Sequence, residues 1–131
     1  MSPVSVAVKS VKPGVRIVGI EPEGSPTLAA CLQAGRKVRL DAVTSRVATM
    51  SCRETDERIF QIVRRNVDEI LLVSDDEMLE ASRWLWSEFA IAADLSGAAS
   101  IAALRRWPER FTNMGKVCAL VCGAGSDGIG S

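Results

Sequence analysis

The stretch that decides the fold is Lys116-Val-Cys-Ala-Leu-Val-Cys-Gly-Ala-Gly-Ser-Asp127, near the end of the 131-residue chain. Its apolar run, rich in Val and Leu, follows a lysine and ends in Gly-Ala-Gly, as a buried strand does when it opens into a glycine turn. In an open α/β sheet, ligands bind where the strands have their carboxyl ends. We therefore expect residues 117–122 to form a strand and the loop after it to belong to a ligand site.

Two further apolar runs, residues 15–20 and 69–73, have the same buried-strand pattern, and helical segments separate them. Strands that alternate with helices indicate a parallel sheet with right-handed crossovers. The sequence therefore predicts one α/β domain over residues 1–131. We expect a parallel or mostly parallel sheet of three to four strands flanked by helices, which is a partial three-layer α/β/α arrangement. The loops 21–25 and 122–127 should lie at one edge of this sheet, together with the start of the helix over 96–106.

Helical spacing and end signals place the other helices. We expect helices over residues 4–12, 27–34, from about 55 to 67, 74–90 and 96–106. Ser25 has the pattern of an N-cap with Pro26 at the first helical position, and Gly35 that of a C-terminal left-handed residue. Ser74 and Glu77 form a capping box. Residues 36–53 read as a long connection with one short strand near 38–40.

Two helix faces bear on possible contacts with other molecules. Val4, Ala7, Val8 and Val11 share one face of the first helix. In the helix over 74–90 an apolar arc is expected, formed by Met78, Leu79, Ser82, Leu85, Trp86 and Phe89. Trp84 points away from this arc, among glutamates, which leaves two alternatives. It either marks an interface or lies over the side chains of its own neighbours.

Composition and charge exclude several classes of function. Sixteen basic and sixteen acidic residues give a net charge of zero, so the chain lacks the basic footprint that nucleic-acid binding requires. The pairs Arg64-Arg65 and Arg105-Arg106 are interpreted as solvated helix faces. No apolar run approaches the roughly 20 residues that span a bilayer, and the N-terminus has no signal-peptide pattern. We expect a cytoplasmic protein with no nucleic-acid or membrane partner.

The residues that the sequence lacks narrow the chemistry further. The chain contains no His and no Tyr, so neither Ser-His-Asp nor Cys-His catalysis can be built within it. Its four cysteines show no CxxC spacing, and a zinc site is not expected. The hydrophobic fraction of 47% exceeds what a small domain commonly carries once the 10 glycines are added. Apolar surface that awaits a partner, or a well-buried sheet, explains this excess.

Four segments together resemble a known family. They are Val-Gly-Ile-Glu-Pro-Glu-Gly-Ser-Pro-Thr-Leu (18–28), Val-Asp-Glu-Ile-Leu-Leu-Val-Ser-Asp-Asp-Glu (67–77), Ala-Asp-Leu-Ser-Gly-Ala-Ala-Ser-Ile-Ala-Ala-Leu (93–104) and Val-Cys-Gly-Ala-Gly-Ser-Asp (121–127). In this order they resemble the C-terminal half of threonine/serine dehydratases, pyridoxal-phosphate enzymes of fold type II in the tryptophan synthase beta-like superfamily. The resemblance covers nearly the whole chain.

The resemblance implies a cofactor site at the end of the last predicted strand. In this family a neutral Ser, Thr or Cys faces the pyridine nitrogen of pyridoxal phosphate, and Cys122, followed by Gly123, matches that position. Asp94 stands where the family usually has a Glu near the cofactor ring. These three are the candidate cofactor-binding residues, on condition that a complementary half is present. Glu21 matches a carboxylate that binds a cation in some relatives, but Thr27 replaces the second carboxylate, so no metal site is expected.

The resemblance also shows which parts of the family site are missing. The family carries its Schiff-base Lys and a glycine-rich phosphate cradle upstream of the matched motifs, and none of Lys9, Lys12, Lys37 and Lys116 has a matching context. We expect a truncated dehydratase-like half-domain without catalytic residues of its own, which does not bind pyridoxal phosphate alone. Its expected partner is a second copy or a complementary N-terminal half. The alternatives are a non-catalytic oligomerising or ligand-binding module and a subunit of a split pyridoxal-phosphate lyase.

Overall fold

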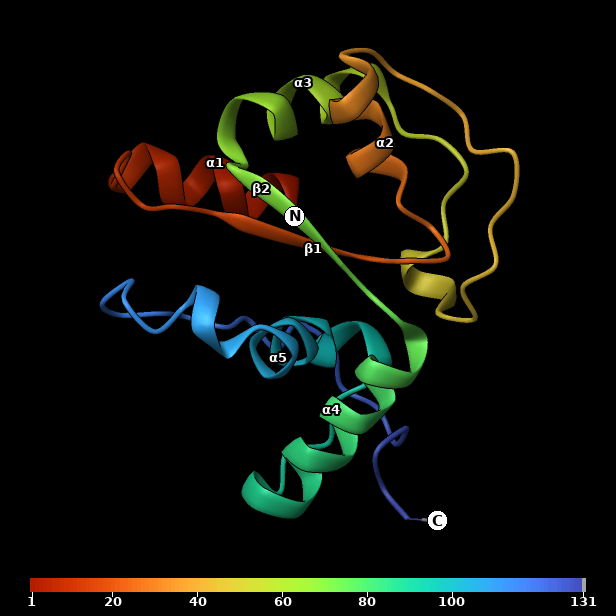
Figure 1. The fold of residues 1–131 in the computed structure, drawn as a ribbon, viewed down its shortest axis with the longest axis vertical. Helices are drawn as coiled ribbons and strands as arrows, with labels where there is room; N and C mark the ends of the chain where they lie inside the picture. The colour runs from red at the N-terminus through yellow and green to blue at the C-terminus, as the bar shows by residue number, and fades with distance from the viewer. Residues whose placement is uncertain (131) are drawn as a thin grey trace.

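The computed structural model describes residues 1–130 and shows an α/β fold (Figure 1). In chain order the elements are α1 (Ser2–Val11), β1 (Val18–Pro22), α2 (Thr27–Ala34), η1 (Ala48–Met50), α3 (Glu57–Asn66), β2 (Glu69–Val73), α4 (Asp75–Phe89), α5 (Leu95–Arg106) and η2 (Pro108–Arg110). The two strands pair in parallel, with Val18 opposite Glu69 and Pro22 opposite Val73. The predicted α/β class with a parallel sheet flanked by helices is confirmed.

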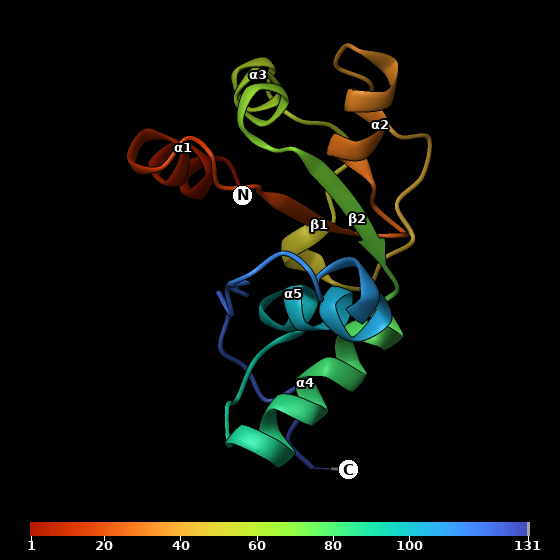
Figure 2. The ribbon, with the colours of Figure 1, turned by 60° about the vertical axis from the view of Figure 1, so that its left-hand side comes forward.

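The helices cover the sheet in two layers. Helices α1, α2 and α3 lie on one side of the strands, and α4 and α5 lie on the other (Figures 1 and 2). This is the partial three-layer arrangement that the strand–helix alternation predicted. No helix in residues 1–130 combines the length and the apolar character needed to cross a membrane.

The main core lies between the sheet and the α4–α5 pair. Val73 and Met78 are fully buried there, beside the alanines of α5. Alanine side chains let helix axes approach closely, so the small residues of α5 bring this helix into direct contact with both α4 and the strands. The small residues of α5 are therefore used for packing inside the chain.

The predicted third strand is not formed. The sheet in residues 1–130 has two strands, and residues 117–122 are assigned to no strand. Val117 and Leu120 are 45% and 54% exposed, and this segment is attached to α5 through a hydrogen bond from Ser100 Oγ to the Leu120 carbonyl (3.0 Å). A strand requires a neighbouring strand to share its backbone hydrogen bonds, and nothing in the described residues supplies one here.

The cap of α2 also differs from the prediction. The Ser25 hydroxyl is hydrogen-bonded to the backbone of Cys52 rather than to α2. The first N–H groups of α2 are instead satisfied by the Glu21 carboxylate, which accepts from Leu28 N–H and Ala29 N–H, both at 2.9 Å. A carboxylate at a helix N-terminus complements the positive end of the helix dipole, so Glu21 performs the capping role that the sequence assigned to Ser25.

Of the remaining local predictions, two are confirmed and one is wrong. Gly35 ends α2 in the left-handed conformation, and Ser74 and Glu77 form the complete capping box of α4, both as predicted. The strand expected near residues 38–40 is absent from the described chain, where Leu40 N–H donates to a single carbonyl, that of Arg53. Short apolar runs become strands only when a partner is aligned beside them.

Trp84 is partly buried against its own neighbours. Its ring meets Phe89 edge to face at 5.0 Å, and the Arg105 guanidinium lies 5.1 Å from its centre. Of the two alternatives for Trp84, the structure favours contact with its own neighbours. Trp86 and Phe89, predicted for the apolar arc, are 40% and 58% exposed.

Asp68 joins α1 to the beginning of both strands. Its Oδ2 accepts a hydrogen bond from Ile17 N–H (2.8 Å) and one from the Lys9 ammonium (3.0 Å). The Ile17 N–H, followed by Lys9, lowers the pKa of Asp68, because both donors favour the charged carboxylate.

The C-terminal loop packs against α4 and α5 without room for side chains at Gly123, Gly125 and Gly128. A Cβ on Gly123 would overlap the Asp94 carboxylate, and one on Gly128 would overlap the backbone of Ser82. Each close approach therefore depends on glycine at that position.

We predict that Asp68→Asn lowers the free energy of unfolding at pH 7 by about 0.5–1 kcal/mol, because a partly exposed charged hydrogen bond contributes that order. The folded pKa of Asp68 is below the ordinary value of 3.8. The stabilisation is therefore present above that value and disappears as the pH falls through the folded pKa. Urea unfolding between pH 7 and pH 3 measures this, with the exposed Asp41→Asn as the control. A difference that stays constant into acid contradicts the assignment.

We predict that Gly123→Ala lowers the free energy of unfolding by about 1–3 kcal/mol, because the added methyl group forces the loop away from Asp94. Gly14→Ala is the matched control, since a methyl group there meets nothing within 4 Å. It should change stability by less than about 0.5 kcal/mol. Equal effects of the two substitutions in thermal or urea unfolding would show that the loop is not held in this position.

Candidate functional site

Asp94 stands at the N-terminus of α5 and caps it. Its Oδ1 accepts hydrogen bonds from Gly97 N–H (2.5 Å) and from Ser96 Oγ (2.8 Å). The helix therefore begins at Leu95, one residue earlier than predicted. The signal for this was in the sequence, since Asp is one of the residues preferred at the N-cap.

The loop after residue 122 is fastened to the same helix start. Asp94 N–H donates to the Gly123 carbonyl (3.3 Å), and Gly125 N–H donates to the Ala92 carbonyl (3.1 Å). Asp127 adds a further contact, because its Oδ2 accepts from Leu95 N–H at 2.9 Å. Gly97 completes the fit, since a side chain on it would overlap Gly123. Asp127 is a functional residue of this junction that the sequence reasoning missed.

Cys122 precedes this junction and presents an exposed, free thiol. The structure thus brings the predicted residues Asp94 and Gly123 into contact, with Cys122 next to them along the chain. A thiol can accept or donate a weak hydrogen bond, so Cys122 has the chemistry of a neutral partner for a ring nitrogen.

The loop after β1 does not reach this junction, which corrects the expectation of a single ligand edge. The Arg106 guanidinium, at the C-terminal end of α5, binds Glu23 at 2.7 Å, whereas Gly123 contacts the opposite end of α5. A helix of 12 residues is about 18 Å long, so the two loops are separated by that order of distance. The cause is the antiparallel turn between α4 and α5, which carries the start of α5 away from the sheet edge.

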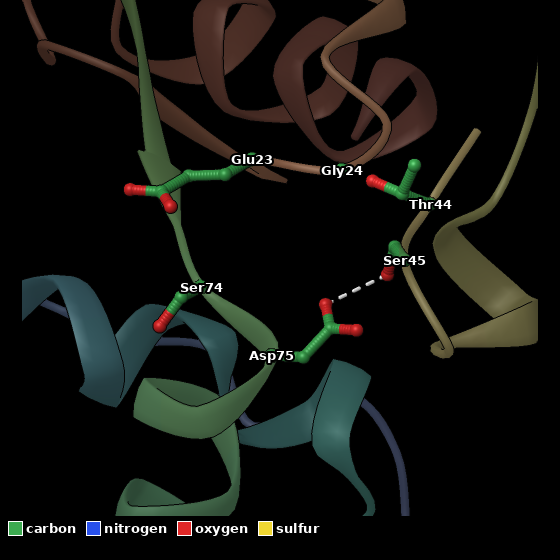
Figure 3. A pocket seen from close by; sticks show the side chains of 6 residues that line it. All are labelled: Glu23, Gly24, Thr44, Ser45, Ser74 and Asp75. Atoms are coloured by element: carbon green, nitrogen blue, oxygen red, sulfur yellow. Dashed lines mark hydrogen bonds between the residues drawn. The ribbon is translucent and has the colours of Figure 1, made fainter. Parts of the chain in front are cut away.

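A polar cavity of about 290 Å³ lies at the carboxyl edge of the strands (Figure 3). Its lining residues are Glu23, Gly24, Thr44, Ser45, Ser74 and Asp75. The Asp75 carboxylate is already occupied, because it accepts from Ser45 Oγ (2.8 Å) and from Arg46 N–H (2.7 Å). Among residues 1–130 no buried side-chain nitrogen or oxygen lacks a hydrogen-bond partner.

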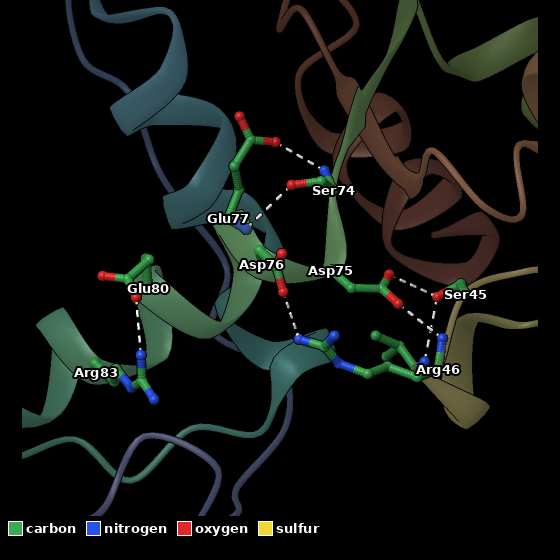
Figure 4. A network of polar contacts seen from close by, with 9 residues as sticks. Ser45, Arg46, Ser74, Asp75, Asp76, Glu77, Glu80 and Arg83 are labelled. Carbon is green, nitrogen blue, oxygen red and sulfur yellow. Dashed lines mark hydrogen bonds and ion pairs between the residues drawn. The ribbon is translucent and has the colours of Figure 1, made fainter. Parts of the chain in front are cut away.

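The start of α4 carries a network of polar contacts (Figure 4). Arg46 pairs with Asp76 at 2.7 Å, and the Ser74–Glu77 capping box lies beside this pair. Arg106 then links Glu77, Glu23 and the Leu72 carbonyl, so one guanidinium connects the end of α5 to both strands. These hydrogen bonds raise the pKa of Arg106, led by the one to Glu23. The sequence analysis had interpreted Arg106 only as a solvated charge.

Glu21 has a structural role at the start of α2. Burial raises the pKa of Glu21, and the N–H groups of Ala29 and Leu28 partly offset that effect. Thr27 donates to the Cys52 carbonyl at 2.5 Å and faces no second carboxylate. Residues 1–130 contain no cluster of three or more His, Cys, Asp or Glu side chains that could hold a metal.

The residues present fit one edge of pyridoxal phosphate only. Cys122 offers a neutral hydrogen-bonding group, and the Gly123 loop offers backbone at a tight junction. Lys9, however, is held by Asp68 at 3.0 Å, and Lys12, Lys37 and Lys116 are exposed surface residues. In residues 1–130 no lysine forms a hydrogen bond at the Cys122–Gly123 junction.

The chain is similar in sequence to several pyridoxal-phosphate enzymes. It is 31% identical over 127 residues to phenylserine dehydratase of Ralstonia pickettii, covering 97% of this chain and 39% of that protein. It is 29% identical over 126 residues to L-threonine ammonia-lyase of Thermotoga maritima, covering 96% of this chain and 31% of that protein. The chain thus spans about a third of the length of these relatives.

Solved structures show the same fold. The T.th. threonine deaminase superposes with a TM-score of 0.78 at 34% identity, over 83% of this chain and 39% of that one. The serine racemase of Dictyostelium discoideum, at 21% identity and a TM-score of 0.81, shows the shared fold alone, over 95% of this chain and 39% of that one. The model of the family described as "Pyridoxal-phosphate dependent enzyme" matches residues 2–123. The chain therefore belongs to the pyridoxal-phosphate dependent enzyme family, of which it contains a part of the fold.

Proposed function

We propose that this chain is a dehydratase-like half-domain that forms the pyridine-facing wall of a pyridoxal-phosphate site and is not catalytic alone. The observation that carries the proposal is the junction at the start of α5, where the Gly123 loop is fastened to Asp94 beside the exposed Cys122 thiol. The reaction class is β-elimination from threonine or serine. Support for this class comes from the threonine and phenylserine enzymes to which the chain is similar.

The roles of Cys122 and Asp94 in this proposal follow from the charges and hydrogen bonds near the junction. The chemistry that pyridoxal phosphate supplies when bound is stabilisation of negative charge at the amino-acid carbon. In our proposal Cys122 accepts or donates one neutral hydrogen bond at the ring nitrogen and adds no positive charge there. In this proposal Asp94 acts on the loop rather than on the ring, because its Oδ1 is engaged by Gly97 N–H and Ser96 Oγ. It is a positioning residue that holds the loop.

The lysine and the phosphate cradle come from a complementary part of the fold in this proposal, on the same polypeptide or on another. The position of Lys9 supports this division, because its ammonium is held at the start of β2 by Asp68. The coverage of about a third of each relative supports it too. Four free cysteines are typical of a reducing compartment, and we propose the cytoplasm as the location.

We predict that the isolated chain forms no lysine-linked cofactor with pyridoxal phosphate and releases no 2-oxobutanoate from threonine. The physical reason is that no described lysine stands at the Cys122 wall. An absorbance titration with the cofactor and an assay of 2-oxobutanoate measure the two results, with the T.th. threonine deaminase as the positive control. A cofactor band that one Lys→Ala substitution abolishes would overturn the proposal.

We predict that Cys122→Ala reduces turnover several-fold to about tenfold when the chain is joined to the N-terminal part of the T.th. threonine deaminase, because one neutral hydrogen bond is lost. Cys122→Ser should restore most of the loss, since a hydroxyl keeps the hydrogen bond. Cys118→Ala is the matched control, because Cys118 is also an exposed free thiol. The role of Cys122 is wrong if the Cys118 and Cys122 variants of this chimera turn over threonine equally well.

A further inference from the structure

A second cavity, of about 350 Å³, lies between the beginning of α4 and the end of α5. Its lining residues come from these two helices alone and are Asp76, Glu77 and Glu80 of α4 and Ala102, Arg105 and Arg106 of α5. Cavities that hold small molecules commonly measure from about 300 to 1,000 Å³. This cavity therefore has the size of a small-molecule site, and the packing of α4 on α5 fixes the distance between its walls.

The wall formed by α5 carries an arginine without an acidic partner. Arg106 is paired with Glu23 and Glu77, and none of the ion pairs described in residues 1–130 includes Arg105. The Arg105 guanidinium lies 5.1 Å from the centre of the Trp84 ring. A ring contacts the flat face of a guanidinium and leaves the N–H groups at its edge free. Because these N–H groups match the spacing of carboxylate oxygens, the edge of Arg105 suits a carboxylate.

The wall formed by α4 carries carboxylate oxygens that can accept further hydrogen bonds. One oxygen of Glu80 accepts from Arg83 at 2.9 Å, and one oxygen of Asp76 accepts from Arg46 at 2.7 Å (Figure 4). Within residues 1–130 the second oxygen of each carboxylate has no described donor. Asp76 and Glu80 are four positions apart, so they are neighbours on one face of the helix. Two such acceptors suit an ammonium group, which has three N–H donors.

The balance of charges determines which class of ligand this cavity suits. Three carboxylates and two guanidinium groups line it. A simple anion is repelled by the carboxylates and a simple cation by the guanidinium groups, whereas a molecule with one charge of each sign is attracted at both ends. Ala102, which is buried, contributes an apolar methyl group to the same lining.

We propose that this cavity binds a small zwitterion, an α-amino acid whose carboxylate is bound by Arg105 and whose ammonium group is bound by Asp76 and Glu80. Such a ligand links α4 to α5 and stabilises their packing, because it binds the folded chain alone. Neither Cys122 nor pyridoxal phosphate takes part in this binding. The site therefore goes beyond the proposed function and is tested separately from it.

The test is a titration of the 131-residue chain with three probes, followed by the shifts of its backbone amide signals in NMR spectra. L-Alanine carries both charges, propionate keeps the carboxylate alone, and ethylamine keeps the ammonium group alone. We expect L-alanine to give saturable shifts at the beginning of α4 and the end of α5. Propionate and ethylamine should each bind about tenfold more weakly or worse, because each loses one charged hydrogen-bonding group.

Substitutions test the two walls one at a time. Arg105→Gln and Glu80→Gln should each weaken L-alanine binding about fivefold or more, since each removes one charged partner of the zwitterion. The matched controls are Arg64→Gln and Glu88→Gln, because both residues are exposed, lie on helices and are outside the cavity. Both control variants should bind L-alanine within about twofold of the wild type.

Four results would overturn the inference. They are the absence of saturable shifts with L-alanine, shifts that lie outside α4 and α5, propionate or ethylamine binding as tightly as L-alanine, and an equal loss of affinity in the cavity and control variants. Urea unfolding checks that the variants keep wild-type stability, as substitution of exposed residues predicts. The comparison of the three probes uses the wild-type chain, so it decides the question even where a variant fails to fold.

Discussion

The rest of the structure depends on the close packing of α5 against α4 and the strands. Four alanines of α5 are buried at this contact, and no buried side chain of α5 is larger than a methyl group. Small side chains contribute little buried apolar area each, so the stability of the contact comes from close atomic packing over its whole length. The same packing determines where both ends of α5 lie. One end therefore receives the Gly123 loop, and the other end receives the loop after β1.

The two ends of α5 are fastened by opposite charges, which suits the helix dipole. Asp94 accepts from Gly97 N–H at the start, and Arg106 at the end binds Glu23, Glu77 and the Leu72 carbonyl. An anion at the N-terminus and a cation at the C-terminus are each favourable. This arrangement explains why Asp94 is committed to the structure. A carboxylate used as a helix cap keeps the Gly123 loop in place at the start of α5.

The sequence predicted the elements whose signals are local. Residues 69–73 and the Ser74–Glu77 capping box are recognisable because a short apolar run and a cap need only their own neighbours. The predictions from sequence were wrong where the local structure depended on residues that are not adjacent in the chain. Glu21 caps α2 in place of Ser25. Its carboxylate lies seven residues before Leu28 in the sequence and accepts from two N–H groups at once, those of Leu28 and Ala29. Residues 117–122 have the composition of a strand, but the described chain has no edge beside them. The candidate site was predicted in part, since Asp94 and Gly123 meet while the loop after β1 lies elsewhere.

The exposed strand-like segment, the outward stripe of α1 and the excess of apolar residues have one physical cause in common. Each is a group whose preferred neighbour is absent from residues 1–130: a strand edge for residues 117–122 and an apolar surface for Val4 and Val11. Exposed apolar residues are ordinary when they are scattered, but a stripe at helical spacing on a helix held by polar contacts is a surface that the fold presents. The Lys9–Asp68 contact is therefore more than a weak ion pair. By fixing which side of α1 faces the strands, it determines which side faces solvent.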